Sequence, residues 1–288
     1  MEEIAQNIFI EQMYPGLTIG ALKFQDRLFL VDAPPRKDEL LSWRKKLLAL
    51  GGPYRTMLLM LDTNLDRTLG LHRLDAVTLA HENAIEIINK RASSARLPDL
   101  FDGADCNPGD VPDTIEWIEP DITYSTSISV HWDETPLVVT HQAGSHTAGS
   151  WLRYDAEKVI FVGDSVMTQQ PPFLARGDLD QWLSDLIWLR TGTFSDYTII
   201  SSRQGIVNHE TIEQMIGLIT ETKSLVEALV EEGEQSANIP ATALTLLKRM
   251  KLDKESTAHF QDRVIWGLEN YLRHHTSTST TEDYGVKK

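Results

Sequence analysis

Four side chains in this sequence are of types that can do metal chemistry and follow strand-like segments. Asp62 and Asp66 follow an apolar run directly, while His146 and Asp164 follow two later strand-like segments. Carboxylate oxygens and neutral imidazoles are ligands for zinc, iron or manganese. A metal held in this way lowers the pKa of a bound water and generates a hydroxide nucleophile. Side chains of these types, in loops that follow strands, could therefore support metal-dependent hydrolysis.

Apolar patterns predict the elements that position these residues. Residues 54–61 and 158–162 are apolar runs of strand length, and Asp62 and Asp164 follow them closely. Loops at the carboxyl ends of buried strands are common places for binding and catalytic residues. Apolar residues at helical spacing predict helices over residues 38–50, 81–91, 179–189, from 209 onward, 240–250 and 255–274.

The order and spacing of these segments resemble the metallo-β-lactamase superfamily. That family holds two metals with H-x-H-x-D-H, a later G-H-T-x-G-S, then G-D, and a final histidine. Here residues 62–67 read D-T-N-L-D-R, residues 145–150 read S-H-T-A-G-S, and Gly163-Asp164 supplies G-D. The resemblance covers roughly residues 5 to 220. It implies an α/β fold, a four-layer αββα sandwich with additional C-terminal helices.

Residue by residue, the resemblance keeps part of the metal site and alters the rest. Asp66, His146 and Asp164 match the family pattern, and Asp62 stands where the first histidine would be. The three remaining histidine positions, the second, the third and the last, are held by Asn64, Arg67 and Gln204. The implied metal ligands are thus Asp62, Asp66, His146 and Asp164, and the altered or pocket-lining positions are Asn64, Arg67 and Gln204.

Arg67 is the substitution with the largest chemical consequence. A permanent cation repels a divalent metal, so we expect one of the two metal positions to be lost. We expect its guanidinium to pair with Asp66 or Asp164 and to stand in for that ion. The other position keeps Asp62, Asn64 and His146 with Asp164 bridging. It implies either one divalent metal (zinc, manganese or iron) or no metal.

Two functions follow from the resemblance. The first is a divergent hydrolase for a small ester, thioester or lactone, in which Asp66 acts catalytically on the attacking water. The second is a non-catalytic member of the fold that binds a ligand or a protein, with Arg67 in the lost metal position. Classical activity with two metals is not expected in either case. In both cases a small-molecule ligand is the expected partner, and a homodimer remains open.

Composition limits the remaining classes. A net charge of −15 argues against nucleic acid and anionic membranes as partners. Cys106 is the only cysteine and the N-terminus lacks a signal-peptide pattern, which indicates a cytoplasmic protein. We expect residues 1–207 to form the αββα domain, residues 208–275 to form helices packed on it, and residues 276–288 to form a disordered polar tail.

Two further features leave alternatives open. Arg67, Arg153, Arg176 and Arg203 could converge into a local basic pocket within the acidic chain. The segment from residue 169 to residue 173 follows Asp164, and it either lines the pocket or forms a plain loop. Asp62, Asn64 and Asp66 also resemble the start of a calcium-binding loop. The glycine and glutamate that such a loop requires at its sixth and twelfth positions are absent.

Overall fold

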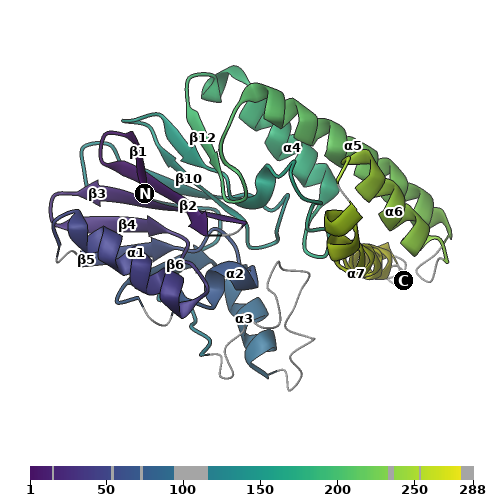
Figure 1. Cartoon of the computed structure of the whole chain (residues 1–288), viewed down its shortest axis with the longest axis horizontal. Helices are drawn as coiled ribbons and strands as arrows, with labels where there is room; N and C mark the ends of the chain where they lie inside the picture. The colour runs from purple at the N-terminus through teal and green to yellow at the C-terminus, as the bar shows by residue number, and fades with distance from the viewer. Residues whose placement is uncertain are drawn as a thin grey trace, which may run out of the picture.

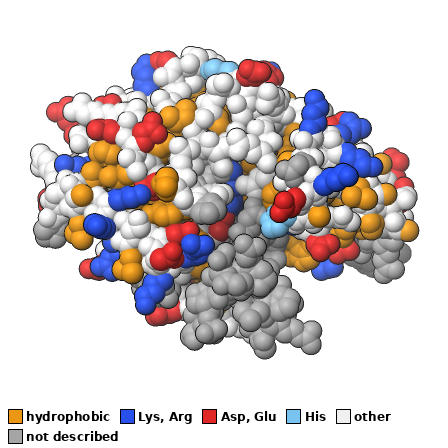
Figure 2. All heavy atoms as spheres, viewed as in Figure 1, with side chains coloured by type: hydrophobic (Ala, Val, Ile, Leu, Met, Phe, Trp, Pro, Cys, Tyr) orange, Lys and Arg blue, Asp and Glu red, His pale blue; other side chains and the backbone are white. Residues whose placement is uncertain are grey.

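A computed structural model describes the chain at residues 1–14, 16–52, 55–71, 74–93, 116–232, 237–252 and 254–279. Two β-sheets form its centre and helices lie on both outer sides (Figure 1). Cys106 and the last part of the predicted tail, residues 280–288, lie outside the described residues. Over the face shown in Figure 2, acidic and basic side chains are intermixed.

The first sheet contains strands β1 to β7 in chain order. Their bounds are β1 Glu2–Ala5, β2 Ile8–Tyr14, β3 Leu17–Phe24, β4 Arg27–Val31, β5 Arg55–Leu59, β6 Val77–His81 and β7 Ile122–Tyr124. Strands β1 to β4 pair antiparallel, whereas β4 to β7 pair parallel. The carboxyl ends of β4, β5 and β6 therefore meet at one edge of the sheet, which brings the residues after them together.

The second sheet has the order β13-β12-β11-β10-β9-β8. Its strands are β8 Ser127–Val130, β9 Leu137–His141, β10 Ser150–Tyr154, β11 Val159–Phe161, β12 Thr198–Ser201 and β13 Gly205–Val207. Only β11 and β12 pair in parallel. The loop after β11 and the turn after β12 consequently open at the same edge.

Seven α-helices are found among the described residues. They are α1 Lys37–Ala49, α2 Leu65–Thr68, α3 Asn83–Ser93, α4 Leu179–Arg190, α5 His209–Glu232, α6 Ile239–Arg249 and α7 Lys254–Ser279. Helix α7 continues to Ser279, although the sequence predicted a disordered tail from residue 276. None of the helices in the described part of the chain is long and apolar enough to cross a membrane.

Alternation along the strands creates the layers. In β4, Leu28 and Leu30 pack with α1, whereas Phe29 and Val31 face the second sheet. In β12, Ile200 faces the first sheet and Ile199 packs toward the helices. Side chains on successive strand residues point to opposite faces, so each sheet is buried on both sides. Three hydrophobic clusters separate four layers, and the predicted αββα sandwich is confirmed.

The C-terminal helices share one of these clusters with the second sheet. Ile212 of α5, Leu246 of α6 and Leu268 of α7 belong to the same hydrophobic cluster as Trp151 and Ile160 of the strands. The helices after residue 208 are therefore packed on the sandwich through a continuous apolar core.

Candidate functional site

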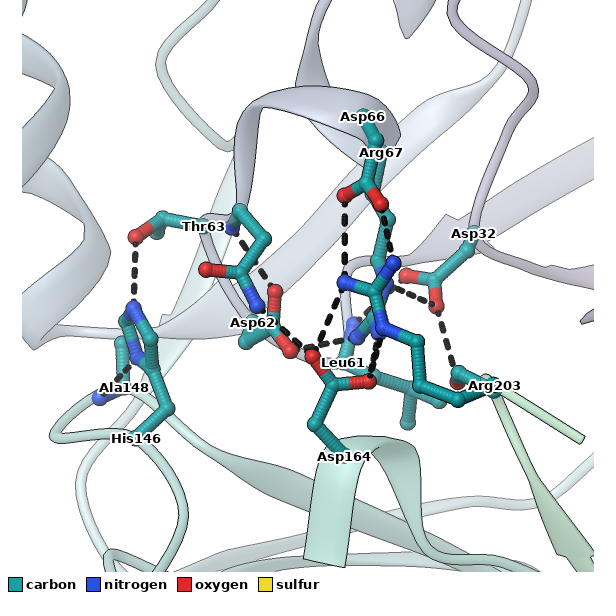
Figure 3. A network of polar contacts seen from close by, with 12 residues as sticks. Asp32, Leu61, Asp62, Thr63, Asp66, Arg67, His146, Ala148, Asp164 and Arg203 are labelled. Carbon is teal, nitrogen blue, oxygen red and sulfur yellow. Dashed lines mark hydrogen bonds and ion pairs between the residues drawn. The ribbon is translucent and has the colours of Figure 1, made fainter. Parts of the chain in front are cut away.

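Strand ends deliver the predicted site residues to one place. Asp62 follows β5, Asp66 and Arg67 lie in the single turn of α2, and Asp164 lies in the 3₁₀ turn Gly163–Ser165 after β11. Gly163 adopts a φ of 58°, a left-handed conformation that glycine tolerates without steric cost. Figure 3 shows the carboxylates of Asp62, Asp66 and Asp164 directed toward a common centre.

Arg67 fills one part of that centre. Its guanidinium donates to Asp62 Oδ2 and to Asp164 Oδ1, and its Nε lies 3.5 Å from Asp32 Oδ2. The predicted pairing with Asp164 is present, whereas the alternative partner, Asp66, is not paired with Arg67. The Arg67 side chain is fully buried. Three carboxylates thus surround a single guanidinium.

Arg203 fills the other part, and the sequence did not assign it this role. Its Nε donates to Asp164 Oδ1 and its Nη2 to Asp164 Oδ2, both at 2.9 Å. Its Nη1 donates to Asp66 Oδ2, and also to the Gly16 carbonyl at 3.2 Å. Asp164 therefore bridges two guanidinium groups (Figure 3). In the family pattern the matching aspartate bridges two metals.

The polar partners of the cluster act as donors. Asn64 donates from Nδ2 to Asp164 Oδ2 at 2.8 Å. Its amide nitrogen therefore faces Asp164, whereas a metal ligand at this position would have to present its amide oxygen. Gln204 points elsewhere, because its Oε1 accepts from the Thr168 backbone N–H at 2.9 Å. The residue predicted at the last ligand position therefore lies outside the cluster.

His146 lies to one side of the carboxylates (Figure 3). Its Nδ1 accepts from the Ala148 backbone N–H at 2.9 Å, and its Nε2 lies 3.2 Å from Thr63 Oγ1. Burial, together with Arg176 and Arg91, holds the pKa of His146 well below its usual value. The ring is therefore neutral, with its proton on Nε2. It donates to Thr63 and cannot act as a base toward that hydroxyl.

The four arginines of the sequence hypothesis behave differently. Arg67 and Arg203 converge on the carboxylates, and Arg176 influences the pKa of His146. Arg153 lies apart and pairs with Asp155 at 2.8 Å.

A cover formed by the segment after Asp164 closes the cluster. The Phe173 ring lies 4.9 Å from Arg203 Cζ and 4.4 Å from Cζ of Arg263, a residue of α7. Arg263 also donates to the Pro171 carbonyl at 2.9 Å and to Gln170 Oε1 at 3.2 Å. Cations over aromatic faces are attracted by the ring quadrupole. Phe173 is itself buried, so this segment covers the cluster and α7 holds it in place.

The residues present do not fit a metal. All eight carboxylate oxygens of Asp32, Asp62, Asp66 and Asp164 have a polar neighbour of the protein, either a guanidinium, an amide or a hydroxyl. No group of three or more His, Cys, Asp or Glu side chains in the described part of the chain is arranged to hold a metal ion. A divalent ion at the centre would have to displace a buried guanidinium and would be repelled by the other.

Asp32 is the fourth carboxylate, and the sequence analysis missed it. It follows β4 directly, accepts from the Leu61 backbone N–H at 2.9 Å, and lies 3.5 Å from the Ser202 hydroxyl. Its φ of 58° turns the chain toward the cluster. Because β4 and β5 are parallel neighbours, Val31-Asp32 was the signal that could have revealed it.

Four carboxylates and two guanidiniums leave an excess of negative charge, so we expect the stability of the folded protein to depend on pH. Burial raises the pKa of Asp32 to about 6, against the opposing effect of Arg67. Between about pH 4 and pH 6 the folded protein keeps the proton of Asp32, whereas the unfolded chain has released it. This proton stabilises the folded state, and the stabilisation is lost as the pH rises through 6. We expect the unfolding free energy of the native protein, relative to Asp32→Asn, to fall by on the order of 1 kcal/mol between about pH 5 and pH 8.

Urea unfolding of both proteins at several pH values measures this difference. Asp38→Asn is the matched control, since Asp38 lies on the surface of α1 with its side chain 75% exposed. A difference between native protein and Asp32→Asn that stays constant from pH 5 to pH 8 would contradict a raised pKa.

Comparison with known proteins supports the fold. A metallo-β-lactamase family protein from Thermus thermophilus superimposes with a TM-score of 0.66 at 15% identity and covers 95% of each chain. A β-lactamase domain protein from Burkholderia ambifaria gives a TM-score of 0.64 at 13% identity, covering 96% of this chain and 88% of its own. TMB-1 gives 0.59 at 12% identity and covers 77% of this chain and 97% of its own.

The chain therefore has the metallo-β-lactamase superfamily fold. No family model matches its sequence, and a search of curated proteins found no match. The structures from T. thermophilus and B. ambifaria cover nearly all of this chain, so they include counterparts for most of α5 to α7. At 12–15% identity, these similarities show the fold alone.

Proposed function

We propose that this protein is a metal-independent binding protein with the metallo-β-lactamase fold, in which Arg67 and Arg203 replace the two metal ions. The observation that carries the proposal is the pair of guanidiniums bridged by Asp164. Each guanidinium supplies the positive charge that clustered carboxylates need, without an ion.

The contacts of Asp66 oppose the hydrolase hypothesis. A catalytic carboxylate must reach a water or a substrate. Both oxygens of Asp66 instead accept from Arg203, and its side chain is only 8% exposed. Hydrolysis of a small ester, thioester or lactone at this place would first require Arg203 to leave the cluster.

The role that remains is binding of a small molecule or of another protein, and the acidic surface makes nucleic acid and anionic membranes poor partners. A cytoplasmic location is part of this proposal and rests on the sequence, whereas homodimer formation stays open.

Metal analysis tests the proposal. We expect protein purified without chelator to carry less than about a tenth of an equivalent of zinc, manganese or iron. We also expect no change in melting temperature on adding these ions, because a ligand stabilises only a folded state that binds it.

A parallel assay with ester, thioester and lactone substrates should give no turnover above that of Asp164→Ala. About one equivalent of metal that is lost in Asp164→Ala, together with turnover that is lost with it, would overturn the proposal in favour of the hydrolase.

A further inference from the structure

A cavity lies at the opposite end of strand β4 from the carboxylates paired with Arg67 and Arg203, which we call the arginine cluster. Its volume is 480 Å³, and four hairpin turns line it, those joining β1 to β2, β3 to β4, β8 to β9 and β10 to β11. Strand β4 begins at Arg27 in this cavity and ends just before Asp32 of the cluster. Five residues of strand separate the two sites by about 16 Å. We refer to this cavity as the turn pocket.

The turn pocket has a floor of interlocked aromatic rings. Phe24 meets Trp132 edge to face at 5.9 Å between ring centroids, and meets Tyr154 in the same way at 5.8 Å. Trp132 also meets Phe29, a fully buried core residue, edge to face at 5.8 Å. Edge-to-face pairs fix the orientation of aromatic side chains. The floor is therefore held in place by both sheets.

Backbone and side-chain contacts also fix the walls. The Lys23 backbone N–H donates to the Asn7 carbonyl at 2.9 Å, which joins two of the four turns. The Tyr154 hydroxyl donates to Asp133 at 3.3 Å and joins the other two. Ligand pockets are usually formed before binding and have volumes of about 300–1,000 Å³. The turn pocket has fixed walls and a volume of 480 Å³, so it matches both properties.

The charges of the lining select the kind of ligand. Lys23 and Arg27 are opposed by Asp26, Asp133 and Glu157. Arg27 also has contacts within the protein, because its Nε lies 3.6 Å from Asp26 Oδ1 and its Cζ lies over the Trp132 ring at 5.6 Å. A strongly anionic or cationic ligand would meet like charges among these lining residues.

A neutral ligand rich in hydroxyl groups meets no such repulsion. Carboxylates accept from hydroxyls, ammonium and guanidinium groups donate to them, and the amides of Gln6, Asn7 and Gln25 do both. The C–H face of a sugar ring also packs well on aromatic side chains. We propose that the turn pocket binds a neutral saccharide, of one or two rings, against Phe24 and Trp132.

This inference extends the proposed binding function but depends on different residues. Metal analysis examines the arginine cluster, whereas saccharide titration examines the turn pocket, so either result can fail without the other.

NMR titration of the full-length ¹⁵N-labelled protein with glucose, N-acetylglucosamine, maltose and cellobiose is the test. We expect at least one of them to shift the indole N–H signal of Trp132, with a dissociation constant on the order of 1–10 mM. Trp132→Phe and Glu157→Ala should each weaken binding about tenfold. Trp188→Phe is the matched control, because Trp188 is 37% exposed on α4, away from the turns, and its replacement should leave binding unchanged.

Glu157→Ala keeps the test decisive if Trp132→Phe fails to fold, because Glu157 lies in a turn and contributes nothing to the aromatic floor. No shift with any of the four saccharides at about 50 mM would overturn the proposal. So would tighter binding of AMP or choline, which would indicate a charged ligand. Loss of binding in Trp188→Phe would place the site elsewhere.

Discussion

Replacing Arg203 with methionine is expected to destabilise the protein by about 3–5 kcal/mol, because it leaves the buried Asp66 without a cation and Asp164 with only one of its two. The Arg203 side chain is 1% exposed and contacts both Asp66 and Asp164. Methionine keeps most of the apolar volume of the arginine side chain, so the loss of stability reports mainly the removal of the positive charge. Chemical denaturation followed by tryptophan fluorescence measures it.

Arg190→Met is the matched control for this change. Arg190 donates to Glu213 at 2.8 Å, but its side chain is 44% exposed, so its removal should cost at most about 1 kcal/mol. Adding Asp66→Asn to Arg203→Met should recover part of the lost stability, since one uncompensated charge disappears. Equal effects of the two arginine substitutions would contradict a buried, electrostatically coupled cluster.

The sequence predicted the fold well because its signals are redundant. The resemblance of the two motifs to the metallo-β-lactamase pattern implied the αββα sandwich, and the strand-length apolar runs and helical periodicity agreed with it. They also placed Asp62, Asp66, Arg67 and Asp164 at one edge. Parallel pairing of β4 with β5 and of β11 with β12 makes that convergence unavoidable, because the strands end together.

The arrangement inside the cluster could not be predicted in the same way. The family pattern aligned Gln204 with the last ligand, but the turn after β12 directs Arg203 inward and Gln204 toward Thr168. A shift of one residue reverses the direction of a side chain near a strand end. No pattern in a single sequence reports which of two adjacent residues faces inward.

The choice of partners for Arg67 also depended on Arg203, whose pairing with Asp66 the sequence did not specify. The prediction considered only Asp66 and Asp164. Because Arg203 occupies both oxygens of Asp66, Arg67 pairs with Asp62 and lies beside Asp32 instead. Competition among buried charges is decided by three-dimensional proximity, which residue spacing does not specify.

If the arginines replace metals, restoring the histidine pattern should restore metal binding. The combined variant carries five substitutions, Asp62→His, Asn64→His, Arg67→His, Arg203→Gly and Gln204→His. The native Asp66, His146 and Asp164 complete the set that the resemblance implies. We expect this variant to take up about two equivalents of zinc. Excess zinc at about 100 times the dissociation constant should stabilise it by about 2.7 kcal/mol for each zinc bound, measured as a rise in melting temperature.

The same variant with Asp164→Ala separates cation replacement from adventitious zinc binding by new histidines. Asp164 bridges both guanidiniums in the native protein, so in the variant it should bridge the two zinc ions instead. Removing Asp164 should therefore abolish zinc uptake and the stabilisation by zinc. Zinc that still binds without Asp164 would be surface binding. A folded five-substitution variant that takes up no zinc would mean that the cluster evolved a geometry unrelated to the metal positions. The equivalence of two guanidiniums with two metals would then be wrong.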